Sequence, residues 1–153
     1  MNNDILKQEI GYQLRQLKKT AESAELLYRE AVGDPKPWHS AAAAKYISDL
    51  MLGLENLWRR RCRHLQFPLP HGPSSHRRVL ADFLNDDGLG GRLPEEFSQR
   101  LGLYLRFRHR FVHGYGFELK WEIVEEPLRL LSDTINRLTE CWEEWLSGFN
   151  STE

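Results

Sequence analysis

The sequence lacks the features that mark disulfide-rich, zinc-clamped and membrane-spanning proteins. It holds only two cysteines, Cys62 and Cys141, too few for a disulfide scaffold or a Cys-rich zinc module. No apolar run approaches the ~20 residues needed to span a bilayer. The first residues have neither the basic nor the apolar region of a secretory signal. We therefore expect a cytoplasmic protein without a membrane segment.

The chain also lacks a clear excess of charge of either sign. It has 21 Lys and Arg residues against 22 Asp and Glu residues, a net charge of −1, which on its face argues against a general nucleic-acid-binding protein. The average hides an uneven distribution, because residues 57–110 carry eleven arginines against five acidic residues and residues 121–153 carry a net charge of −6. Attraction of a phosphate depends on the local field, so the arginine-rich stretch remains compatible with RNA binding.

The alternation of apolar and polar residues that marks half-buried strands is missing as well. Apolar residues instead recur every three or four positions, as they do on one face of a helix. This spacing, interrupted by breaks rich in proline and glycine, predicts long helices at about 6–31, 40–64, 94–113 and from Glu126 onward, and a short helix from Ser74 or Ser75 to Asn85. The sequence thus predicts an all-α bundle of four long helices and one short helix, within a single domain at 1–153.

The densest polar cluster lies at the end of the fourth predicted helix. Arg108, His113 and Tyr115 there bring together a permanent cation, a group that titrates near neutral pH and a phenol. Cleavage of an RNA phosphodiester needs a base for the 2′-hydroxyl, an acid for the leaving oxygen and a cation for the phosphorane. Arg108 could supply the cation, and His113 or His109 the acid or base. The competing interpretation is structural, since cations and glycines also favour helix C-termini.

The spacing within this cluster suggests a site built from two copies of the chain. A separation of five residues rotates by about 140° on an ideal helix, so Arg108 and His113 do not share one face unless the helix loosens at its end. A two-fold dimer would bring the two motifs face to face across its axis.

Two further patterns have alternative explanations. His109 and His113 are spaced as zinc ligands on one helical face, and Cys62 or other histidines could join them, but the surrounding arginines repel a dication. We therefore expect no metal. The run Arg59, Arg60 and Arg61 contains bidentate phosphate-binding groups, as does Arg110, although a helix end also favours such cations.

These motifs together resemble those of HEPN domains of the HepT type, the ribonuclease toxins of HEPN/MNT toxin–antitoxin pairs. The first shared motif is Arg, four residues, His, one residue and Tyr, here Arg108 to Tyr115. The second is Gly-Leu-Glu-Asn at 53–56, followed by a Pro/Gly loop and by His76-Arg77-Arg78-Val79-Leu80. The resemblance covers about residues 5–148.

The resemblance implies a HEPN-like helical bundle that works as a homodimeric, metal-independent endoribonuclease without a cofactor. Arg108 and His113 would cleave the RNA. Tyr115 would be modified with AMP by a minimal nucleotidyltransferase antitoxin, and the added phosphate charge would act as a local switch. Glu55 would have a supporting role.

One departure from the family pattern leaves the acid and base assignment open. The family often has Asn after the motif arginine, whereas this chain has His109, so either His109 or His113 could be the main acid or base. The alternative function is a catalytically silent HEPN-like module that binds RNA, a nucleotide or a partner protein.

Overall fold

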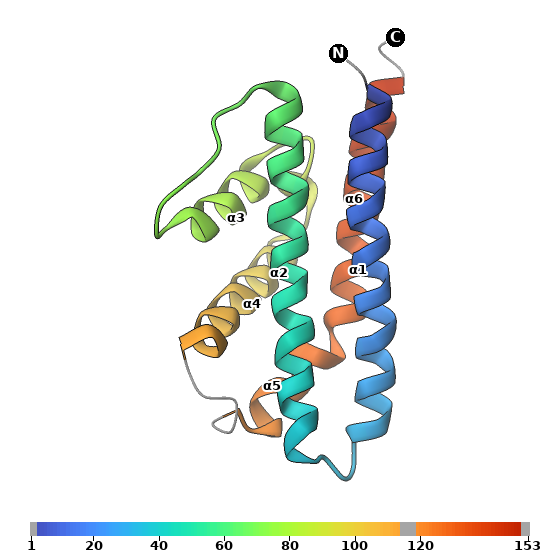
Figure 1. Cartoon of the computed structure of the whole chain (residues 1–153), viewed down its shortest axis with the longest axis vertical. Coiled ribbons are helices and arrows are strands. Elements are labelled where there is room, and N and C mark those ends of the chain that lie inside the picture. Colours follow the sequence, from blue (N-terminus) through green and yellow to red (C-terminus); the bar gives the residue numbers. More distant parts are fainter. Residues whose placement is uncertain (1–2, 114–118, 151–153) are drawn as a thin grey trace.

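A computed structural model describes residues 3–113 and 119–150, and helices account for nearly all of them (Figure 1). The elements are α1 (Asn3–Ala31), α2 (Pro37–Leu65), α3 (Ser75–Asn85), the short 3-10 helix η1 (Gly90–Arg92), α4 (Glu95–His113), α5 (Trp121–Arg129) and α6 (Leu131–Asn150). Within these two ranges there is no β-strand, so the all-α prediction is confirmed. None of the described helices is long and apolar enough to cross a bilayer.

The long helices α1, α2 and α6 run side by side and form the body of the molecule (Figure 1). The apolar stripe predicted for the first helix is buried, and Leu6, Ile10 and Leu17 are almost fully enclosed. Helix α2 approaches α1 closely at Gly53, where an added Cβ would lie 2.6 Å from Cδ2 of Leu17. Glycine is needed there because any side chain would force the two helices apart or displace Leu17.

The C-terminal part of the chain differs from the sequence prediction. We expected a helix to start near Glu126, but α5 already begins at Trp121 and has Pro127 in its interior. The chain then leaves the helix at Leu130 before α6 starts. Proline has no backbone N–H to donate, which weakens the helix at this point and favours a break. Val124 and Leu128 are buried, so the short helix is stabilised by packing that its sequence alone does not reveal.

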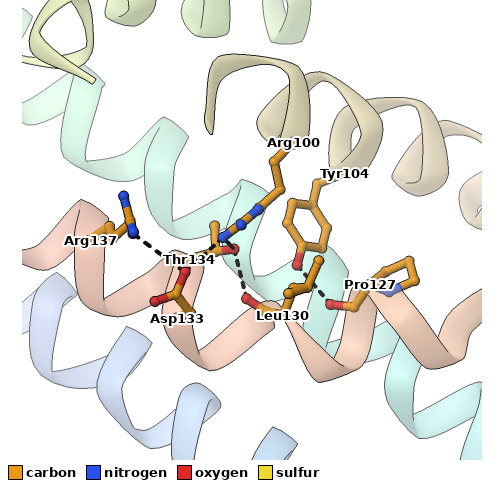
Figure 2. A network of polar contacts seen from close by, with 7 residues as sticks. All are labelled: Arg100, Tyr104, Pro127, Leu130, Asp133, Thr134 and Arg137. Carbon is orange, nitrogen blue, oxygen red and sulfur yellow. Dashed lines mark hydrogen bonds and ion pairs between the residues drawn. The ribbon is translucent and has the colours of Figure 1, made fainter. Parts of the chain in front are cut away.

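A polar network fixes the middle of α4 onto α5 and α6 (Figure 2). The Tyr104 hydroxyl donates to the Pro127 carbonyl oxygen at 2.7 Å, and Arg100 donates to Asp133 at 2.8 Å. Burial raises the pKa of Tyr104 to about 12, so the phenol stays neutral and remains a donor. Anchored in this way, α4 ends on the same side of α2 as the start of α3 (Figure 1).

Candidate functional site: a basic groove between two helices

A groove of about 880 Å³ lies between the start of α3 and the last turns of α4. The described residues of its lining include four arginines and two histidines but no acidic residue: Pro73, Ser74, His76, Arg77, Leu105, Arg106, Arg108, His109 and Arg110. Arginines present several donors in a planar fork, a geometry that matches phosphate oxygens. The groove can therefore bind a polyanion.

Local amphipathicity orients these side chains toward the groove. Helix α3 buries Val79 and Phe83 in the core, and α4 buries Leu101, Tyr104 and Phe107. The residues between these positions fall on the other helical faces, which is why the polar positions of both helices meet in the groove.

The groove arginines have no carboxylate partner. None of the four forms an ion pair with another residue in the ranges 3–113 and 119–150. Other arginines of the basic stretch are neutralised, because Arg92 pairs with Glu144 at 3.0 Å and Arg100 pairs with Asp133 at 2.8 Å. The positive charge of the groove arginines is therefore not neutralised by neighbouring described residues.

Of the four motif residues predicted to act in catalysis or regulation, two line the groove, and the side chains of the other two lie outside the described part of the chain. Arg108 and His109 are both lining residues. Helix α4 continues without loosening to His113, whose side chain lies outside the described part of the chain. Tyr115 also lies outside the described residues.

A hydrogen-bonded pair from two different helices contributes one of its members, His76, to the groove lining. The carboxylate of Glu55, on α2, is hydrogen-bonded to Nδ1 of His76, on α3. The Glu55 side chain is only 8 % exposed, whereas the His76 side chain is 39 % exposed and lines the groove. Glu55 was expected to have a supporting role, but His76 and the groove residues Arg77 and Arg106 were not predicted as site residues. The only sequence signal for His76 and Arg77 was their place in the second shared motif.

The arginine run of α2 does not contribute to the groove. Arg61 is 8 % exposed and forms an ion pair with Asp86 at 2.5 Å. Its guanidinium group lies 4.5 Å from the centroid of the Trp58 ring. Arg61 therefore has a structural role through Asp86 and the Trp58 ring, and its binding of RNA stays a prediction. Arg59 and Arg60 are half-buried and lie outside the groove lining, whereas Arg110 lies within it.

The two cysteines are buried, free thiols. Burial raises the pKa of Cys62, and it raises the pKa of Cys141 to about 11. Neither is the thiolate that nucleophilic catalysis would require. Across the described ranges, no three His, Cys, Asp or Glu side chains are grouped as metal ligands.

Comparison with known proteins identifies the family. The family model described as HepT-like protein matches residues 42–149, well over half of the chain. This match contains the groove, the Glu55–His76 pair and the Arg108 motif. No curated protein sequence and no solved structure matches the chain. With its all-α fold, the chain belongs to the HepT-like family, as a HEPN domain of the HepT type.

Proposed function

We propose that this protein is a metal-independent endoribonuclease toxin that binds RNA in the groove between α3 and α4. The observation that carries the proposal is the set of four groove arginines that pair with no carboxylate of the described residues, one of which is Arg108 of the family motif. The phosphates of an RNA backbone would supply the negative charge that these arginines lack. A cation at the scissile phosphate also stabilises the phosphorane.

The helical geometry supports an active site shared by two copies. Because α4 remains helical to His113, the rotation of about 140° between Arg108 and His113 applies to this helix. Positions 108 and 113 thus fall on different faces of an ideal helix. In a two-fold dimer, Arg108 of one copy would lie near the motif of the other, and both would act on one phosphate.

The resemblance to HepT-type toxins supports inhibition through Tyr115, which follows His113 by two residues in the sequence. A minimal nucleotidyltransferase antitoxin would transfer AMP to the Tyr115 hydroxyl. The new phosphate would compete with RNA for the groove arginines, since it brings negative charge to the end of α4.

An RNA cleavage assay in the presence of EDTA tests the nuclease. Arg108→Ala and His113→Ala should each lower the cleavage rate by about 100-fold or more, because each removes a group that acts on the transition state. Arg63→Ala is the matched control: it removes an exposed arginine of α2 that does not line the groove, and it should cut RNA like the wild type.

Three results would contradict the proposal: intact RNA with the folded wild type, full activity in both motif variants, or loss of cleavage with EDTA. Binding of RNA without cleavage would favour the silent module. For the antitoxin, co-expression with a minimal nucleotidyltransferase should add AMP to Tyr115, and a Tyr115→Phe variant should stay unmodified and active. An adduct on another residue would exclude this switch.

A further inference from the structure

The Glu55–His76 pair is built like the orienting half of a catalytic dyad. A carboxylate as buried as that of Glu55 must be hydrogen-bonded, and Nδ1 of His76 meets this need. The pairing fixes the ring orientation, because Glu55 belongs to the long helix α2 and is enclosed by the core. Histidines that transfer protons in enzymes are commonly held in this way by a carboxylate.

His76 is also one of the residues that line the groove. In a neutral imidazole one nitrogen is a donor and the other an acceptor. If Nδ1–H donates to the Glu55 carboxylate, Nε2 on the far side of the ring carries the lone pair. The ring lines the same groove as Arg106 and Arg108. A substrate phosphate held by these arginines would therefore lie beside a nitrogen that can accept a proton.

We propose that His76 is the general base of RNA cleavage and that Glu55 is its positioning residue. This inference depends on the nuclease function proposed above. His76 Nε2 takes the proton of the 2′-hydroxyl, the 2′-oxygen bonds to phosphorus, and the bond from phosphorus to the 5′-oxygen breaks. The 5′-oxygen takes a proton from His113, and the products are a 2′,3′-cyclic phosphate and a free 5′-hydroxyl. Exchange with water then returns both histidines to their starting states.

The assignment gives each of the two proton transfers of phosphodiester cleavage its own group. His76 acts on the 2′-hydroxyl, and the motif histidine acts on the leaving oxygen. A purely structural link between α2 and α3 would not need a ring that lines an arginine-rich groove with 39 % of its side chain exposed.

The test compares His76→Asn with His113→Asn on two RNA substrates. In His76→Asn the amide of the new side chain can occupy the place of Nδ1 and donate to Glu55, so the link between the helices is kept while proton transfer is lost. We expect kcat to fall about 100-fold while KM changes less than about 3-fold. His71→Asn is the control, because His71 is an exposed histidine outside the groove lining and should leave both constants unchanged.

The second substrate carries sulfur in place of the bridging 5′-oxygen. A thiolate leaves without being protonated, so this substrate should restore the rate of His113→Asn, which lacks the acid. It should not restore the rate of His76→Asn, which lacks the base. Restoration of His76→Asn would overturn the assignment of His76 as the base, and wild-type kcat in His76→Asn would overturn any role for it in proton transfer.

A second variant guards against a folding defect. Glu55→Gln still accepts a hydrogen bond from Nδ1 but no longer places a negative charge beside the ring. Its kcat should fall about 10-fold at constant KM, with a wild-type circular dichroism spectrum. An unchanged kcat would refute the positioning role of Glu55. An inactive wild type would instead remove the nuclease function itself, and this inference with it.

Discussion

The buried guanidinium of Arg61 offers the sharpest stability test of the fold. It pairs with Asp86 at 2.5 Å and lies over the rings of Trp58, Phe67 and Trp145, at 4.5, 5.4 and 5.8 Å from their centroids. Arg61→Ala removes the ion pair and these three contacts together. The change also leaves the Asp86 carboxylate, which is 19 % exposed, without its cation.

The size of the effect follows from these two losses. Breaking a buried ion pair by removing one partner costs about 3–5 kcal/mol. Water can reach Asp86, which favours the lower end of that range, and the lost cation–π contacts add about 1 kcal/mol. We expect Arg61→Ala to lower the free energy of unfolding by about 4 kcal/mol and, for a chain of this size, Tm by about 10 °C.

Urea unfolding followed by circular dichroism measures this loss. Arg63→Ala is the control, because it removes an exposed arginine of the same helix and should change stability by less than about 0.5 kcal/mol. Arg61→Met keeps an apolar stem against the rings and should recover part of the loss. A loss of less than about 1 kcal/mol for Arg61→Ala would refute the structural role of this arginine and return it to the RNA-binding surface.

Two further substitutions and one thiol-reactivity measurement test other parts of the structure. Gly53→Ala should cost about 1–2 kcal/mol in urea unfolding because its Cβ meets Leu17, and a gain in stability would show that the helices can separate freely. Tyr104→Phe should cost about 1–2 kcal/mol by removing the donor to Pro127. The raised pKa of Tyr104, about 12, favours the folded state fully below pH 10, and this contribution is lost as pH rises from about 10 to 12. A pH series should show that alkaline loss in the wild type and a smaller one in Tyr104→Phe. The Cys141 thiol, with a pKa of about 11, should react slowly with Ellman's reagent at pH 8 until the protein is unfolded, and rapid reaction in the native state would contradict its burial.

Local sequence information was enough to predict the helices but not the last helical boundary. Apolar spacing and Pro/Gly breaks act within a few residues of each other, so the first four helices are confirmed near their predicted positions. The start of α5 depends on burial of Val124 and on the bond from Tyr104 to the Pro127 carbonyl oxygen. These contacts come from packing against other helices. The position of a proline in the sequence does not predict such packing.

Sequence reasoning predicted only the part of the candidate site that comes from one continuous segment, the end of α4. Arg108 and its neighbours form one segment, whereas His76 and Arg77 reach the groove through the packing of α3 near α4. The number of arginines in a segment also does not show which way each side chain points. Successive residues on a helix point about 100° apart, so Arg61 could be buried while its neighbours in the same run were not.

The same packing explains why a net charge of −1 is a poor guide to what the molecule binds. Glu144 and Asp133, both from the acidic C-terminal segment, neutralise Arg92 and Arg100 near the start of α4. Asp86 neutralises Arg61 within the core. Three arginines of the basic stretch are therefore neutralised, whereas the groove arginines form no ion pair with any described residue. A phosphate responds to that local field within a Debye length of about 8 Å, so a chain of nearly zero net charge can still present a strongly basic site.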